Sequence, residues 1–202
     1  MPYPLIIRDS NFMVQHNSAS IVNRRSAFEI MDSLFTGDAQ LERTEPVLRC
    51  LDCRVNKVSF NTFSHLQVSS VIEGNIDGNE VEETPSIIIE SNEFLNIKSS
   101  TSGGAIYLNW VGSYSIRHNT FNSIKSEVIG SQGGAIYSSV QSAHSVIEIS
   151  SNSFRECQAE QGGAIMWDYH EPLLQNNTFD SNEASLYAKD IGSYGRKLLF
   201  LN

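Results

Sequence analysis

The richest group of side chains that could do chemistry is Trp167-Asp168-Tyr169-His170, which combines two aromatic rings, a carboxylate and an imidazole. Trp110 lies at nearly the same phase of an earlier repeat, so the two indoles could share one face. Aromatic rings beside polar groups are typical of sites that bind sugar rings or a protein partner. Trp110, Trp167, Asp168, Tyr169 and His170 are therefore the candidate ligand- or partner-binding residues. The favoured interpretation is that both tryptophans cap loops and cover the flank of the fold.

Carboxylate catalysis requires a more specific arrangement than this sequence offers. Glycoside hydrolysis uses two carboxyl groups about 5 to 10 Å apart. Asp168 with Glu171 is the nearest aligned pair, and its flanking residues carry no recognised catalytic signature. We therefore expect a protein that is not an enzyme, and we keep a polysaccharide-active lyase or hydrolase as an alternative.

The three cysteines form an odd set that does not suggest a disulfide framework. Cys157 lies three residues after a repeated phenylalanine, where other repeats place Leu or Ile, so we expect a buried thiol. Cys50 and Cys53 have the spacing of half a zinc site, with His65 as a lone third candidate. Packing as free thiols is favoured over a local disulfide or a zinc site, and we expect no metal and no cofactor.

Charge and hydropathy exclude two further classes of site. The formal net charge is −9, and the 14 basic residues are scattered, so no nucleic-acid partner is expected. No apolar run reaches the roughly 20 residues that a membrane span requires, so we expect no membrane insertion by this segment. The acidic segment 75–83 resembles a calcium loop, but its glycine falls at the wrong position, which favours a solvated insertion.

Two periodic motifs define the elements that position these residues. Gly-Gly-Ala-Ile occurs at Gly103–Ile106, Gly133–Ile136 and Gly162–Ile165, with starts 30 and 29 residues apart. It alternates with an Asn-x-Phe motif, and such a period indicates a solenoid. The Asn-x-Phe copies are Asn61/Phe63, Asn92/Phe94, Asn119/Phe121, Asn152/Phe154 and Asn177/Phe179, and Ser10/Phe12 and Ser33/Phe35 are copies with Ser in place of Asn.

The residues around each phenylalanine predict one strand, a corner and a return to the core. Five residues before the phenylalanines, every position is apolar: Ile7, Ile30, Val58, Ile89, Ile116, Ile149 and Leu174. Asn suits the corner because it tolerates a left-handed backbone and its amide can bond the Asn of the next coil. The glycine pairs Gly103/Gly104, Gly133/Gly134 and Gly162/Gly163 mark a second corner, where the backbone must pass without a Cβ.

These patterns predict an all-β fold, a right-handed parallel β-helix of about seven coils that forms a single domain over residues 1–202. The alternating motifs resemble the repeat of the polymorphic outer-membrane protein family of chlamydial bacteria. The closing segment Asn182–Tyr194 is more similar to repeats of large surface proteins of ciliated protists. The resemblance covers residues 86–195 well, and residues 1–85 through the phenylalanine-aligned core. It implies a pectin-lyase-like β-helix displayed outside the cell, with a role in adhesion or in a structural coat.

We therefore expect an extracellular, non-enzymatic scaffold or adhesion-type module that is a piece of a longer surface protein. The expected partners are other protein subunits or surface glycans, with homo- or hetero-assembly through the β-helix ends. A subunit that assembles into a filament or coat is the alternative function. Asn176, in the sequon Asn176-Asn177-Thr178, is the candidate glycosylation site.

Overall fold

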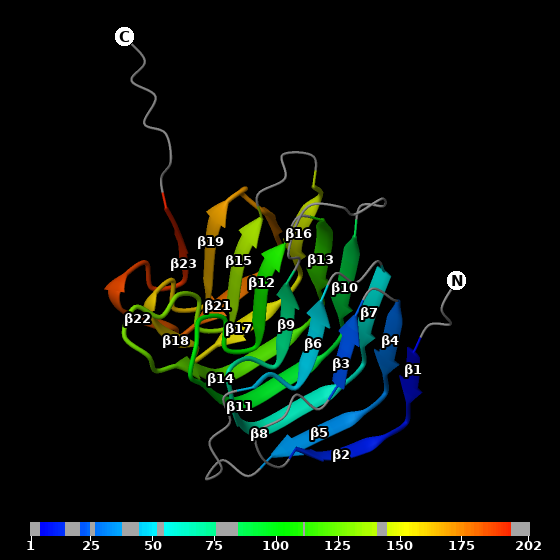
Figure 1. The fold of residues 1–202 in the computed structure, drawn as a ribbon. Coiled ribbons are helices and arrows are strands. Elements are labelled where there is room, and N and C mark those ends of the chain that lie inside the picture. Colours follow the sequence, from blue (N-terminus) through cyan, green and yellow to red (C-terminus); the bar gives the residue numbers. More distant parts are fainter. Residues whose placement is uncertain are drawn as a thin grey trace.

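The computed structural model describes residues 5–14, 21–24, 27–37, 45–51, 55–75, 85–110, 112–140 and 145–194, and in these ranges the regular elements are all β-strands. The chain winds through three parallel sheets in turn, which confirms the predicted all-β parallel β-helix (Figure 1). Within the described ranges no helix is long and apolar enough to cross a membrane.

Sheets A and C receive one strand from each turn of the chain, and sheet B receives one or, near the C-terminal end, two. Sheet A contains β1 (Leu5–Arg8), β4 (Phe28–Met31), β7 (Val55–Ser59), β10 (Ser86–Glu90), β13 (Ser113–Arg117), β16 (Ile147–Ser150) and β20 (Leu173–Gln175). Sheet B contains β2 (Asn11–Val14), β5 (Leu34–Gly37), β8 (Thr62–Val68), β11 (Glu93–Ser99), β14 (Thr120–Ser126), β17 (Ser153–Arg155) and β21 (Thr178–Asp180), with β18 (Gln158–Gln161) and β22 (Glu183–Tyr187) beside them. Sheet C contains β3 (Ile21–Arg24), β6 (Leu48–Leu51), β9 (Ile72–Asn75), β12 (Ile106–Trp110), β15 (Ile136–Val140), β19 (Ile165–Tyr169) and β23 (Ile191–Ser193).

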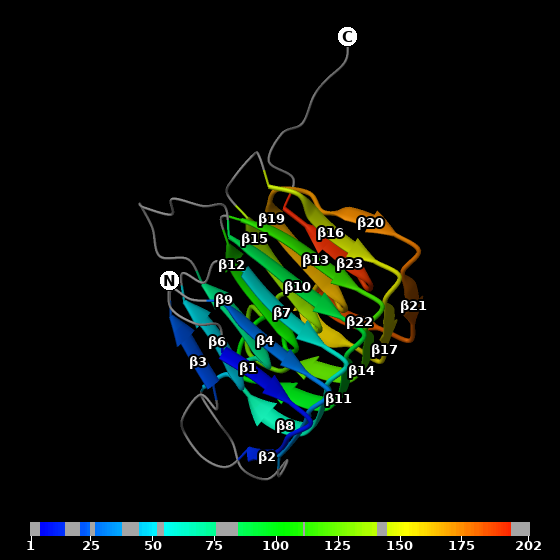
Figure 2. The ribbon, with the colours of Figure 1, turned by 90° about the vertical axis from the view of Figure 1, so that its right-hand side faces the viewer.

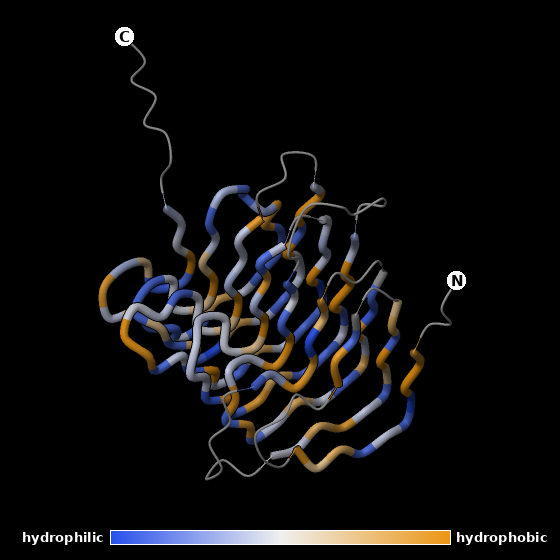
Figure 3. The backbone as a smooth tube through the Cα atoms, in the orientation of Figure 1, coloured by the Kyte–Doolittle hydropathy of each residue, from blue (hydrophilic) through white to orange (hydrophobic). Residues whose placement is uncertain are grey.

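The core lies between the three sheets, where apolar side chains of the same repeat position stack on each other. In sheet A the register joins Ile30, Val58 and Ile89, which are fully buried. In sheet C the isoleucine of Gly-Gly-Ala-Ile stacks in the same way, from Ile106 to Ile136 to Ile165. Apolar segments therefore recur at the same place from one coil to the next (Figure 3).

The phenylalanines of the Asn-x-Phe motif form one continuous stack through sheet B. Neighbouring rings have centroids 4.7 to 5.2 Å apart and are nearly parallel. This spacing follows from the distance between neighbouring strands, about 4.8 Å, because each ring extends from the same register position. The stack contains Phe12, Phe35, Phe63, Phe94, Phe121, Phe154 and Phe179.

A ladder of asparagines, buried except for the partly exposed Asn177, holds the corner between sheets A and B. The Asn92 amide Nδ2 donates to the Asn119 Oδ1 at 3.0 Å, and Asn119 donates to Asn152 in the same way. Each Oδ1 also accepts the backbone N–H of the preceding asparagine, as in Asn61 to Asn92 at 3.0 Å. The same pattern runs through Asn61, Asn92, Asn119, Asn152 and Asn177.

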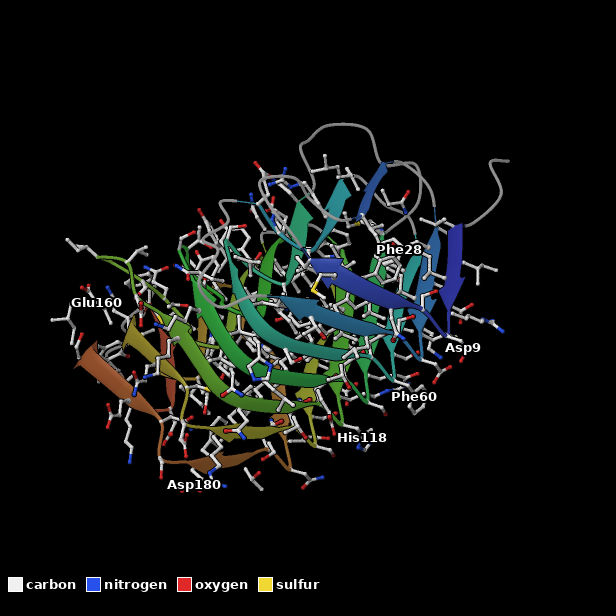
Figure 4. All side chains as sticks on the ribbon, turned by 90° about the horizontal axis from the view of Figure 1, so that it is seen from below. Asp9, Phe28, Phe60, His118, Glu160 and Asp180 are labelled. Carbon is white, nitrogen blue, oxygen red and sulfur yellow. The ribbon has the colours of Figure 1, made fainter. Side chains whose placement is uncertain are left out.

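The expected left-handed backbone at these asparagines is wrong by one residue. The positive φ values, 49° to 57°, belong to the residues directly before the ladder: Asp9, Asp32, Phe60, Ser91, His118, Ser151 and Asn176. The sharp turn therefore precedes the asparagine, and the asparagine side chain stays free to reach the next coil. Asp9, Phe60 and His118 follow this corner on the outside (Figure 4).

The glycine pairs mark the corner that leads into sheet C, and the two members of each pair serve different needs. The first glycines, Gly103, Gly133 and Gly162, have φ of +61°, +62° and +61°, a conformation that L side chains rarely adopt. The second glycines carry the close approach between coils. A Cβ on Gly104 would lie 2.6 Å from the Gly134 carbonyl oxygen, and one on Gly134 would lie 2.1 Å from the Gly163 carbonyl oxygen.

The cysteines adopt two different states. Cys157 is a buried free thiol, as expected, and burial raises its pKa to about 12. The favoured prediction that Cys50 packs as a free thiol is wrong, because Cys50 is buried and disulfide-bonded. Cys53 lies outside the described residues, as does most of the acidic segment 75–83.

Candidate functional site

Trp110 lies in the core, so the predicted role of Trp110 in ligand binding is wrong. Strand residues alternate between the two faces of a sheet, and Ile106, Leu108 and Trp110 all point inward from β12. Trp110 is 1% exposed, and a Cβ added to Gly74 would meet its ring at 3.2 Å. The missing side chain at Gly74 thus provides the room that the indole fills.

The second tryptophan also points inward, but at a different register position from the first. Trp167 points inward from β19, at the register position of Ser138, and packs half-buried against the core. Trp110 is instead in register with Val140, whose next partner is Tyr169. The prediction that the two indoles form one exposed binding face is therefore wrong, because both point inward and they occupy different columns.

The other three residues of the predicted patch lie at the end of β19, which contains Asp168 and Tyr169, and in the bend at His170 that follows it. The Asp168 Oδ1 accepts the Tyr169 N–H at 2.9 Å, and the Asp168 carbonyl accepts the His170 N–H at 3.2 Å. Tyr169 is 46% exposed at a φ of 73°. Glu171 is exposed and lies beyond the end of β19. Of the predicted Asp168–Glu171 pair, Asp168 alone therefore belongs to sheet C.

The outer face of sheet C gathers a different set of side chains, which we call the tyrosine face. It consists of Tyr107 and Tyr137 with the neighbouring polar residues Asn75, Asn109, Ser139 and Asp168. Tyr107 and Tyr137 directly follow Ile106 and Ile136, so alternation turns them outward. Their rings stack with centroids 5.3 Å apart and an interplanar angle of 25°.

The polar residues of the tyrosine face form a row beside the two rings. Asn75, Asn109, Ser139 and Asp168 occupy the same register position on consecutive strands β9, β12, β15 and β19. The Asn109 Nδ2 donates to the Asn75 Oδ1 at 3.4 Å. Amide, hydroxyl and carboxylate groups thus follow each other at the spacing of parallel strands, about 4.8 Å.

Both phenols of the tyrosine face are neutral at physiological pH. Burial, followed by the charge of Glu73, raises the pKa of Tyr107. Burial, followed by Tyr107 and Asp168, raises the pKa of Tyr137 to about 12, against the opposing effect of a hydrogen bond with Ser139. A neutral phenol can donate as well as accept a hydrogen bond, so the face offers both functions beside its aromatic carbon.

Other side chains bound the tyrosine face on two sides. On the side of β6, Arg49 pairs with Glu45 at 2.7 Å and with Glu73 at 3.3 Å. On the side of β19, the next outward position is Met166, which is fully buried. The Met166 sulfur would lie 2.8 Å from a Cβ on Gly192, so β23 approaches it closely.

A pocket lies where β18 and β22 meet. Its volume is about 410 Å³, and its lining includes Gln158, Asn182, Glu183 and Lys189. Three of these polar residues already have hydrogen-bond partners: Gln158 donates to Glu183 at 3.3 Å, and Asn182 donates to the Phe154 carbonyl at 3.2 Å. The tyrosine face is therefore the better candidate. Among the described residues, no cluster of His, Cys, Asp and Glu could hold a metal ion.

The sequence prediction missed Tyr107 and Tyr137, although a signal for them is present. The first two Gly-Gly-Ala-Ile copies are both followed by Tyr. Counting alternation from the isoleucine places that tyrosine outward, and it places Trp110, four residues after Ile106, inward.

The candidate glycosylation residue Asn176 is exposed at the corner between sheets A and B. The following Asn177 belongs to the ladder and donates to the Ile149 carbonyl at 2.7 Å. The two adjacent asparagines thus point to opposite sides of the chain, and Asn176 faces solvent.

Comparison with known families supports the resemblance drawn from the motifs. Residues 93–109 match the family model of the Chlamydia polymorphic membrane protein repeat. The matched segment covers β11, the glycine corner and most of β12, and it includes Tyr107 and Asn109 of the tyrosine face. No curated protein and no solved structure matches the chain significantly.

Proposed function

We propose that this chain is a non-enzymatic β-helical module of an extracellular surface protein, and that it binds ligands or partners through the tyrosine face. The stacked rings of Tyr107 and Tyr137 beside the polar row carry the proposal. Such a combination of aromatic carbon and hydrogen-bonding groups suits the hydroxyl-rich surface of a glycan. The match of residues 93–109 to a membrane-protein repeat supports a place at the cell surface.

The polar row supports recognition more than catalysis. Asp168 contributes a carboxylate whose Oδ1 accepts a backbone N–H, and the preceding members of the row, Ser139 and Asn109, are neutral. Hydrolysis of a glycoside calls for a second carboxyl group across the bond. Release of reducing sugars from a polysaccharide by the wild-type chain, lost in Asp168→Asn, would contradict this part of the proposal.

The binding test compares the wild-type chain with the double variant Tyr107→Ser/Tyr137→Ser on an array of immobilised neutral and acidic oligosaccharides. We expect at least about a tenfold loss of affinity for the bound glycans, which corresponds to about 1.4 kcal/mol. Tyr187→Ser is the matched control, because Tyr187 is 50% exposed but lies on β22 and is not part of the tyrosine face; its hydroxyl donates to the Ser193 carbonyl of β23 at 3.3 Å. Equal binding by all three proteins, or no binding by the wild type, would refute the tyrosine face as a glycan site.

A further inference from the structure

The two ends of the β-helix present strand edges that match each other. In the described part of the chain, β1, β2 and β3 have one neighbour each, and so do β20, β21 and β23 at the opposite end. The two sets lie at opposite ends of the stack of coils (Figure 2). Such edges carry unpaired backbone donors and acceptors and can pair with another chain. We propose that the last coil of one copy of this chain stacks on the first coil of a second copy.

The core columns have compatible residues at both ends. The phenylalanine stack begins with Phe12 and finishes with Phe179, both partly buried, while the five rings between them are fully buried. The sheet A column begins with Ile7 and finishes with Leu174. The sheet C column begins with Ile21 and finishes with Ile191. A second copy in register would therefore continue all three columns and cover their end residues.

The outer positions of the two ends are also compatible. Ile6 and Leu173 occupy the same outward column of sheet A, and they are 51% and 55% exposed. Stacking would place these two exposed apolar side chains against each other. Two residues further along the same strands, Arg8 would lie opposite the neutral Gln175. No two like charges would therefore face each other at this position.

The corner ladder gives the contact a direction. Along the ladder each backbone N–H donates to the side chain of the following coil, from Ser10 to Ser33 at 3.2 Å and from Asn152 to Asn177 at 3.0 Å. The Asn177 N–H has no acceptor among the described residues. At the other end, Ser10 Oγ donates to the Arg8 carbonyl at 2.9 Å and keeps its acceptor capacity. Head-to-tail stacking supplies Ser10 Oγ of the second copy to the Asn177 N–H.

A second copy is the occupant that fits, because the contact would repeat the interface that already joins each coil to the next. The contact is head-to-tail, so it does not close on itself, and it produces an open filament. This inference does not depend on the tyrosine face, which lies on the flank of the coils. Loss of glycan binding would leave it intact.

The first experiment measures the oligomeric state of the full 202-residue chain by sedimentation velocity over a wide range of protein concentration, with electron microscopy of the assembled fraction. The wild-type chain is expected to form linear assemblies that lengthen with concentration. Ile6→Lys/Leu173→Lys places like charges opposite each other and should weaken assembly at least about tenfold. Ile6→Lys/Leu173→Glu should restore it. Ser115→Lys is the matched control, since Ser115 occupies the same column in a middle coil, beside Glu148.

A crosslinking experiment tests the register directly. Thr178 and Asn11 are exposed and occupy the same column of sheet B at opposite ends. A mixture of Thr178→Cys and Asn11→Cys chains should be joined by a short thiol crosslinker, whereas Thr178→Cys mixed with the middle-coil variant Thr120→Cys should not. A wild-type chain that stays monomeric at all concentrations would overturn the proposal. Assembly that is insensitive to the like-charge variant, or equal crosslinking in both mixtures, would also overturn it.

Discussion

The asparagine ladder makes the replacement of Asn119 the most informative single perturbation of this fold. The Asn119 amide donates to the Ile89 carbonyl at 2.9 Å, to the Arg117 carbonyl at 3.0 Å and to Asn152 Oδ1 at 3.0 Å. Its Oδ1 accepts the Asn92 N–H at 2.9 Å and the Asn92 Nδ2 at 3.0 Å. Asn119 is 2% exposed, so water cannot replace these partners.

Asn119→Ala removes these bonds and leaves the Asn92 N–H without an acceptor. The Asn119 NH2 group has two hydrogens, so we count two donated bonds at about 1 kcal/mol each and about 1 to 3 kcal/mol for the Asn92 N–H left unpaired, and we expect a loss of roughly 4 kcal/mol in the free energy of unfolding. That is a large share of the total stability of about 5 to 15 kcal/mol that is usual for a domain. The loss is measured by urea denaturation, as a lower midpoint at an unchanged slope.

The chain itself supplies the matched control. Ser33 occupies the same ladder position, where its Oγ accepts the Ser10 N–H at 3.2 Å and donates to the Met31 carbonyl at 2.9 Å. Asn119→Ser keeps both functions and should lose only about half as much stability as Asn119→Ala. Hydrogen exchange of the Asn92 amide should accelerate in the Ala variant and much less in the Ser variant. A loss below about 1 kcal/mol for Ala, or equal losses for Ser and Ala, would refute this account of the ladder.

Two other positions give predictions with sharp controls. Gly134→Ala should cost roughly 3 kcal/mol because the added Cβ would lie 2.1 Å from the Gly163 carbonyl oxygen, whereas Gly130→Ala should cost only about 1 kcal/mol, since Gly130 has a φ of +80° but nothing within 4 Å. Thermal melts compare the two variants, and equal losses would show that steric contact between coils is not the cause. Glu90 pairs with Lys57 at 2.9 Å and Arg117 at 2.8 Å, and the hydrogen bond from Lys57, ahead of that from Arg117, lowers the pKa of Glu90. A lowered pKa contributes stability above the unfolded value of 4.5 that is lost as the pH falls through the folded value. Glu90→Gln should therefore cost about 1 kcal/mol at pH 7, and the difference from wild type should disappear under acid conditions; a difference that does not change with pH would contradict the ion-pair explanation.

The coil could be predicted from the sequence because its core repeats by position. Phe94 and Phe121 stack because their strands are neighbours in register, and the sequence shows that register as the recurrence of Asn-x-Phe. The glycine corners were predictable for the same reason. Contacts between coils join residues at equal positions in successive repeats. They can therefore be predicted without knowing the conformation of the loops.

The candidate site was less predictable because it depends on the direction in which single side chains point. Trp110 was predicted to bind a ligand because of its residue type. It lies four residues after the inward-facing Ile106 on the same strand, so alternation turns it inward as well. Tyr107, next to Ile106, turns outward and stacks on Tyr137. The left-handed residue before each ladder asparagine was missed because its position in the motif accepts Asp, Phe, Ser, His and Asn alike, as in Asp32, Phe60 and His118. Such a position has no composition signal.

The ladder also bears on how a gene for such a protein can change in length. Its steps join residues 23 positions apart at Ser10 and Ser33 and 33 positions apart at Asn119 and Asn152, yet the hydrogen-bonding geometry is alike. For example, residues 127–135 connect β14 to β15 and the shorter segment 100–105 connects β11 to β12, yet β12 and β15 stay paired in register. Unequal recombination could remove the 27 residues from one ladder asparagine to the next, as between Asn92 and Asn119. The asparagines on either side of the deletion would then still be able to hydrogen-bond each other. Insertion or deletion of one whole coil would therefore change the length of the β-helix by about 4.8 Å and would require no compensating substitutions in the core.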